Sequence, residues 1–318
     1  GGAAKAGKTA VVRALLAAEV DPNAHGNALA AACELKDLEI VRLLLRAGAH
    51  VDAPYAAAMG GNDHTPLMIA CEANSLEIVR ALIRRGADLN RLAGEPPNST
   101  SALHTAYISG SSNILELLLS LGADPNIVVQ GRTVLHDAIE VRDWKVVKML
   151  LEQEIDLDIP CSLPHDENEE ENGEDGHTAL MMMCALREAD TAEGLGYLAA
   201  EDLSGGENEE SENEGEENKN VEEDGGNDNM EKIEKAWIPA LLDDMAEDED
   251  DGDDEDESDD EVKKIRDIIQ TMIAQGANLG VARWDGSTAL HVAVQNLNAV
   301  ALKELLRRRA KVDVNAVR

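Results

Sequence analysis

Phenylalanine is absent from this sequence of 318 residues, and aromatic residues make up only 2% of it. The apolar content of 43% is nevertheless high enough for a folded core. That core must be built from Ala, Leu, Ile, Val and Met, because larger apolar side chains are scarce. Closely packed helices can use this set of residues, whereas β-sandwiches usually need more aromatic side chains. The composition therefore predicts a helical protein.

Long apolar runs and paired cysteines are also missing. No run approaches the ~18 apolar residues that a membrane span needs, and no charged stretch leads into an apolar signal segment. The four cysteines have no paired spacing, which indicates a reducing compartment rather than a disulfide scaffold. We therefore expect no membrane association and a cytoplasmic or nuclear location. The first residue is Gly rather than Met, which leaves open that the sequence is part of a longer protein.

Basic residues are scarce in one segment only. The formal net charge is −36, but residues 166–261 alone contain 40 acidic and 4 basic residues. The remaining 24 acidic residues balance 24 basic ones, so the excess negative charge belongs to an insertion in a neutral protein. Runs such as "EDEDDGDDEDESDDE" are too charged to collapse around a core. We therefore predict that residues 187–261 are mostly disordered.

The rest of the sequence repeats itself. In most copies a Thr or Ser that can cap a helix precedes a short apolar helix, and a longer apolar helix follows and ends near Gly. One such helix pair cannot bury its own apolar face, so neighbouring pairs must stack into a continuous core. The segments that align in this way are Gly26–Asp52, His64–Asn90, Thr100–Asn126, Arg132–Asp158 and Ser287–Asp313.

The second of these segments, His64–Asn90, contains the run "TPLMIA" followed by "GADLN". It resembles the ankyrin repeat, with Met68 where that family has His. The resemblance covers nearly everything outside the acidic insertion. It implies an all-α protein, an ankyrin-repeat α-solenoid of helix-turn-helix units with short hairpin turns, interrupted by the long acidic disordered insertion. We expect about seven units, the first incomplete and the sixth split.

The domain boundaries follow from this arrangement of repeats. Residues 1–165 hold ankyrin repeats, and 166–186 hold an acidic lead-in and the first helix of the split repeat. The acidic insertion of 187–261 separates that helix from 262–318, which hold the second helix of the split repeat and the last repeat. Long insertions in loops are tolerated because the entropy of loop closure grows slowly with length.

The first residues also match a nucleotide-binding pattern. Gly2–Thr9 reads GAAKAGKT, which fits the P-loop pattern G-x-x-x-x-G-K-[ST]. A P-loop needs a strand before it, and only Gly1 precedes this motif. The repeat frame instead places Gly7, Lys8 and Thr9 in the loop between the helices of the partial first repeat. We therefore interpret the match as a coincidence and expect no cofactor.

Histidines and cysteines follow the repeat rather than forming a catalytic group. The resemblance implies a structural role for His104, His136 and His291, which stand where the ankyrin motif has His. His64 and His177 precede the capping Thr, so we expect them at the surface.

Cys33, Cys71 and Cys184 share one apolar helix position, which is typical of packed core residues. Cys161 is the cysteine expected to be exposed. These patterns predict no catalytic residue, no metal site and no enzymatic activity. The acidic run around Gly252 also fails the EF-hand pattern, because Ser258 stands where that loop needs Glu. Ser204, Ser211 and Ser258 lie among acidic residues and are candidates for phosphorylation.

The resemblance implies that a protein partner binds the concave face formed by hairpin tips and first helices. We expect no nucleic-acid partner, because a tethered polyanion competes with phosphate for any basic groove. Trp284 is the strongest single candidate, since an exposed Trp is typical of binding hot spots. The predicted contact residues are His64, Glu72, Ile108, Ser109, Arg132, Glu140, Val141, Trp284, Asp285 and Gln295.

A helix is predicted within the acidic insertion, at residues 229–246. Its apolar residues recur at three- and four-residue steps, although Pro239 favours a kink. Such a helix must dock, either on the repeats of this chain or on another protein. The residues of its apolar stripe are Met230, Ile233, Trp237, Leu241 and Met245.

Three functions remain open at this point. The first is a non-catalytic scaffold for protein–protein interaction. The second is a binder or chaperone of basic proteins such as histones, with the acidic insertion as the active part. The third is an ankyrin segment of a larger enzyme such as a kinase, ubiquitin ligase or acyltransferase. Binding by a polyanion is sensitive to salt, which separates the second function from the first.

Overall fold

The computed structural model describes residues 2–24, 28–55, 63–94, 99–162, 176–186, 257–296 and 298–312. In these ranges the chain forms helices and no β-sheet, apart from isolated antiparallel bridges such as Tyr55–His64 and Val129–Arg132. None of the helices in these ranges is long and apolar enough to cross a membrane. The predicted disorder of 187–256 and the predicted helix at 229–246 lie outside the described residues.

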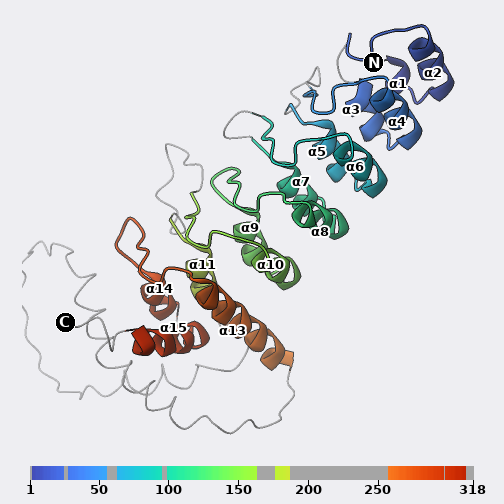
Figure 1. Ribbon diagram of the computed structural model, residues 1–318. Helices are drawn as coiled ribbons and strands as arrows, with labels where there is room; N and C mark the ends of the chain where they lie inside the picture. The colour runs from blue at the N-terminus through green and yellow to red at the C-terminus, as the bar shows by residue number, and fades with distance from the viewer. Residues whose placement is uncertain are drawn as a thin grey trace, which may run out of the picture. The chain divides into compact units, whose positions relative to one another are not determined.

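The helices follow one another as short first helices and longer second helices (Figure 1). The early pairs are α1 (Gly2–Lys5) with α2 (Thr9–Ala17), α3 (Ala28–Glu34) with α4 (Leu38–Arg46), and α5 (Pro66–Glu72) with α6 (Leu76–Ile83). The pairs that follow are α7 (Ala102–Ile108) with α8 (Ser112–Ser120) and α9 (Val134–Glu140) with α10 (Trp144–Leu151). The last helices are α11 (Ala179–Ala185), α13 (Glu257–Gln275), α14 (Ala289–Gln295) and α15 (Ala299–Val312).

The chain divides into two compact units. The first unit comprises residues 1–183 and 271–288, and the second comprises 184–270 and 289–318. In the first unit the pairs from α1–α2 to α9–α10 stack side by side in chain order (Figure 1). In the second unit α14 packs against α15.

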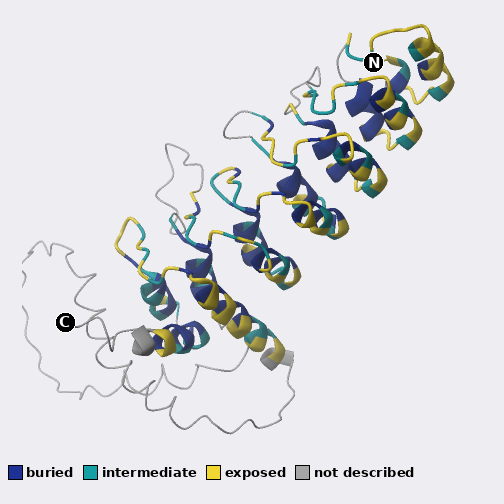
Figure 2. Cartoon of the chain, in the orientation of Figure 1, coloured by how far each residue is buried: buried dark blue, intermediate teal, exposed yellow. Residues whose placement is uncertain are grey.

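Local sequence explains where the helices begin. Thr65 caps α5 by accepting a hydrogen bond from the backbone N–H of Met68 at 3.3 Å, and Pro66 occupies the first helical position, where no N–H is needed. Asp37 caps α4 in the same way, accepting from the N–H of Ile40 at 3.0 Å. The first helices α3, α5, α7 and α9 are buried over most of their length, whereas the second helices expose one face (Figure 2). This pattern is that of a stacked helical array.

The start of the chain fits this arrangement. Gly2–Lys5 form α1, so the residues that would line a P-loop are helical instead. Gly7 has a φ of 64° and lies in the turn between α1 and α2. The segment thus forms a helix pair, as the repeat frame predicted, except that Thr9 begins α2 instead of lying in the loop.

Asp and Asn side chains join successive repeats of the first unit. The Oδ1 atom of Asn90 accepts a hydrogen bond from the backbone N–H of Asp124 at 2.9 Å. One repeat later, Asn126 accepts from the N–H of Asp156 at 2.7 Å. Each bond satisfies a backbone donor in the exit loop of the next repeat, so the loops are held in a common register.

A hydrogen bond of the same kind joins a residue before the insertion to a residue after it. Asp158 accepts a hydrogen bond from the backbone N–H of Asn278 at 2.8 Å. The Gly-Ala-Asn sequence that ends at Asn278 thus occupies the place that Gly-Ala-Asp holds in an unbroken repeat. Gln275, the last residue of α13, also donates from its side chain to the backbone carbonyl of Leu151.

The helix α13 begins at Glu257, ahead of the boundary predicted at Val262. Its first turns are acidic, which complements the positive end of the helix dipole. Lys264 also forms an ion pair with Asp260 one turn earlier, at 2.8 Å. These local interactions extend the helix into residues that the sequence assigned to the disordered insertion.

Candidate protein-binding surface

In the third to fifth repeats, the residues predicted to contact a partner occur at two recurring places. One is the residue before the helix cap in the loop, and the other is the C-terminal end of the first helix. A helix of seven residues makes about two turns, so a long side chain in the loop can lie over the helix and reach its far end. We call the surface formed by these two places, together with the loop that carries Trp284 and Asp285, the binding row.

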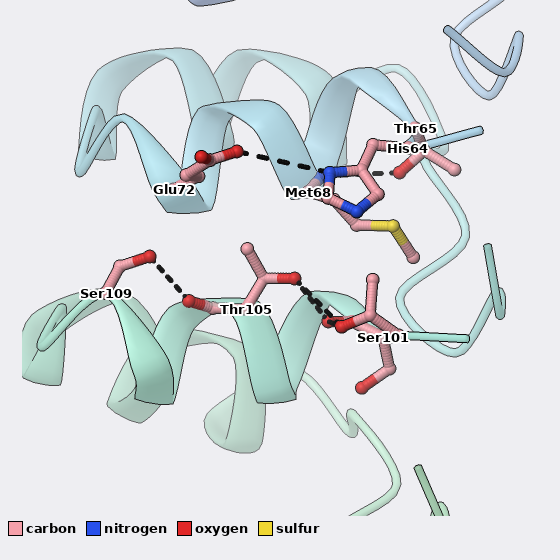
Figure 3. A network of polar contacts seen from close by, with 8 residues as sticks. His64, Thr65, Met68, Glu72, Ser101, Thr105 and Ser109 are labelled. Carbon is pink, nitrogen blue, oxygen red and sulfur yellow. Dashed lines mark hydrogen bonds and ion pairs between the residues drawn. The ribbon is translucent and has the colours of Figure 1, made fainter. Parts of the chain in front are cut away.

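In the third repeat the two places are occupied by His64 and Glu72. The Nδ1 atom of His64 lies 4.0 Å from Oε2 of Glu72 (Figure 3). The Glu72 side chain is 65% exposed. The structure therefore brings these two predicted residues together and leaves the carboxylate accessible to a partner.

The fourth repeat presents an apolar side chain. The hydroxyl of Thr105 donates to the backbone carbonyl of Ser101 at 2.8 Å, and that of Ser109 donates to the carbonyl of Thr105 at 2.7 Å (Figure 3). These hydrogen bonds occupy the hydroxyl donors within the helix itself. Ile108, which ends α7, is left 76% exposed.

The fifth repeat carries a network of charges. Arg132 donates from Nε to Oδ1 of Asp137 at 2.8 Å and from Nη2 to Oε2 of Glu140 at 2.5 Å. Only 12% of the Arg132 side chain is exposed. Burial raises the pKa of Asp137, although the charge of Arg132 and its hydrogen bond act in the opposite direction. Val141 follows directly and is 66% exposed.

The last loop of the first unit contains Trp284 and Asp285. Trp284 is 66% exposed, as the sequence predicted. Asp285 accepts a hydrogen bond from the backbone N–H of Ser287 at 2.8 Å. Although partial burial disfavours its charge, this bond and the nearby Arg283 lower the pKa of Asp285. Gln295 is exposed at the end of α14 and belongs to the second unit.

Sequence reasoning missed two members of the binding row, Asp137 and Thr105. Both lie one turn before the predicted residues of their helices, on the same face. The sequence could have indicated both residues, because Asp137 and Thr105 are polar residues within otherwise largely apolar helices. The residues of the predicted stripe at 230–245 lie outside the described part of the chain.

Two predictions about exposure are wrong. His177 is only 5% exposed and Cys161 only 1%. The two residues pair at the base of one loop, where the N–H of Cys161 donates to the carbonyl of His177 at 2.8 Å. The N–H of Gly176 donates back to the carbonyl of Cys161, also at 2.8 Å. This backbone pairing buries both side chains against the neighbouring loop, where the N–H of Ser162 donates to the carbonyl of Gly131.

The structural role of the motif histidines is confirmed for His104 and His136. Their Nδ1 atoms lie 2.9 Å from Oγ of Ser101 and 2.7 Å from Oγ1 of Thr133. Burial lowers the pKa of each to about 4, so both are neutral at neutral pH. They therefore fix the start of their helices and are poorly suited to exchange protons.

The cysteines of the first helices are core residues, as predicted. Cys33, Cys71 and Cys184 are fully buried, and burial raises the pKa of each thiol to about 12. Protonated, inaccessible thiols are poor nucleophiles and poor metal ligands. Across the described ranges, no three His, Cys, Asp or Glu side chains are grouped so that they could hold a metal ion.

Comparison with known proteins agrees with this architecture. The family model described as ankyrin repeats (3 copies) matches residues 53–129 and 90–161. The single ankyrin repeat model matches residues 27–55 and 285–318. The chain therefore belongs to the ankyrin repeat family, whose repeats serve as modules for protein–protein interaction.

A solved structure shows the same fold. The ankyrin repeat domain of Bcl-3, described as a unique member of the IkappaB protein family, is similar with a TM-score of 0.55 and 17% sequence identity. The similarity covers 96% of each chain. At this level of identity the likeness concerns the fold alone. No curated protein sequence matches the chain.

Proposed function

We propose that the first unit is a non-catalytic scaffold that binds a protein partner along the binding row. The observation that carries this proposal is the exposure of Ile108 at 76%, Val141 at 66% and Trp284 at 66%. Large apolar side chains of this kind contribute most of the binding energy when a partner covers them. Ile108 ends a first helix, Val141 directly follows the next first helix, and Trp284 lies in a loop, so these side chains occur at the helix ends and loops to which the family resemblance assigns partner binding.

The polar members of the row define its rim. Glu72 and Glu140 have side chains exposed by 65% and 53%, so each can pair with a basic group of the partner. Arg132 is held between two carboxylates, which fixes the geometry of the row before a partner arrives. Gln295 extends the proposal to the second unit as a separate contact.

Substitution of the apolar members tests the proposal. Ile108→Asp and Val141→Asp should each abolish retention of partners in a quantitative affinity capture by the intact chain. Leu121→Asp is the matched control, because Leu121 is also exposed, by 49%, but ends the second helix α8. Since all three residues are exposed, circular dichroism should show equal helix content. Retention unchanged by both row variants contradicts the proposal.

The same capture separates the alternative functions. A partner bound through the acidic insertion should be lost at high salt and unaffected by Ile108→Asp, because polyanion binding depends on screened charges. A partner bound to the row should show the opposite behaviour.

A further inference from the structure

Five arginines gather on the outer helices of two neighbouring repeats. Arg42 lies on α4, and Arg46 ends this helix one turn later. Arg80 and Arg84 stand at the equivalent places of α6, and Arg85 follows them. All five are exposed, and α4 packs against α6. Residues four apart lie on one helix face, so Arg42 with Arg46 and Arg80 with Arg84 form one basic surface, and Arg85 follows at its end. This surface is here called the arginine patch.

The patch is not neutralised by its surroundings. In the part of the chain that the structure describes, no carboxylate forms an ion pair with any of the five arginines. On the neighbouring helices the pattern is different. Arg13 of α2 pairs with Glu39, while α8 has Glu116 and Ser120 at the equivalent places.

Helix stability accounts for only part of the patch. Cations in the last turn complement the helix dipole, which explains Arg46, Arg80 and Arg84 but not Arg42. Like charges four residues apart on a helix repel each other. A surface of this kind is stabilised when it binds a negatively charged partner.

The same chain carries a segment of the complementary charge. Residues 187–256, outside the described ranges, contain 29 acidic and 4 basic residues. This segment follows α11, whose first residues belong to the first unit together with the patch. Stacked helices are spaced by roughly 8–10 Å, so three repeats span about 30 Å. About ten extended residues cover that distance, and the segment is much longer.

We propose that the arginine patch binds the acidic segment 187–256 of the same chain. Arginine is well suited to this role, because its planar guanidinium donates two parallel hydrogen bonds to a carboxylate. Attachment to the chain raises the effective concentration of the segment to the millimolar range. Weak individual ion pairs then suffice for occupancy at moderate salt, and the patch is closed to other anions while the segment is bound.

Cross-linking of the intact chain tests this contact. Arg80→Lys and Arg84→Lys retain the positive charge and add amines that a carbodiimide joins to nearby carboxylates without a spacer. Ser120→Lys is the matched control, because Ser120 is exposed at the place on α8 that Arg84 has on α6. Mass spectrometry should find roughly fivefold more links from the two patch positions to residues 187–256 than from the control position. The excess should vanish when salt rises from about 0.05 M to about 0.5 M.

Three results would overturn the proposal. The first is equal linkage from the patch and control positions. The second is linkage only between two copies of the chain, detected by mixing isotope-labelled and unlabelled protein. The third is tight binding of a fluorescent oligothymidine to the intact chain that Arg80→Glu abolishes, because a patch occupied by the segment is closed to an external polyanion.

Discussion

Asp158 accepts a hydrogen bond from the backbone N–H of Asn278 at 2.8 Å, although 120 positions separate the two residues in the sequence. The bond has the same form as those that the backbone N–H groups of Asp124 and Asp156 donate to the side chains of Asn90 and Asn126. It therefore joins the chain that follows the insertion to the fifth repeat, in the register of an uninterrupted array.

Removal of this acceptor should destabilise the first unit. Asp158→Ala leaves the Asn278 N–H without its protein partner, and we expect a loss of about 1 kcal/mol in the free energy of unfolding. Asp158→Asn is the matched control, since Asn makes the same bond at positions 90 and 126 and should retain most of the stability. Urea unfolding monitored by circular dichroism measures both. Equal losses for the two variants would show that charge, not the hydrogen bond, matters.

Stability should fall in mild acid because of His104 and His136. Burial lowers the pKa of each from 6.5 to about 4. Between these two pH values the histidines are protonated in the unfolded state and neutral in the folded state. Their contribution is fully present above about pH 6.5 and is lost as the pH falls toward about 4. Each should cost about 2 kcal/mol at about pH 5.

Urea unfolding of the intact chain at neutral pH and near pH 5 measures this loss. His104→Gln lowers stability at neutral pH, but it should remove about half of the pH dependence assigned to the pair. A slope unchanged by that substitution would argue against the assignment to these histidines.

Trp284 should matter for binding and not for folding. Since the side chain is 66% exposed, Trp284→Ala should change the free energy of unfolding by no more than about 0.5 kcal/mol. The affinity for a partner bound along the row should fall by about tenfold or more. A titration of the purified partner gives the affinity, and thermal unfolding gives the stability. A large loss of stability would place Trp284 in the core instead.

All four thiols should be protected in the native protein. Cys33, Cys71, Cys161 and Cys184 are free and buried. An aromatic disulfide reagent should therefore react with none of them quickly under native conditions and with all four in denaturant. Cys161→Ser identifies the contribution of the loop cysteine. If one thiol reacts rapidly under native conditions and Cys161→Ser abolishes this reaction, Cys161 is exposed, as the sequence predicted.

The sequence determined the local structure of this protein. The repeat period, the capping residues such as Thr65 and the apolar spacing of the helices are all local signals. Most helices form where these signals place them, although α13 begins earlier, at Glu257. The exposure of Ile108 and Trp284 also followed, because positions within a repeat predict which side chains face away from the stack. These features could be predicted because each depends on residues less than one repeat apart.

The tertiary structure decided which separated residues meet. The grouping of Arg132 with Asp137 and Glu140 depends on how a loop folds back over its helix. The burial of Cys161 and His177 depends on backbone pairing between two strands of one loop. The arginine patch arises only when α4 and α6 pack side by side. Local propensity fixes each helix, but only packing brings distant side chains within the few ångströms over which hydrogen bonds and charges act.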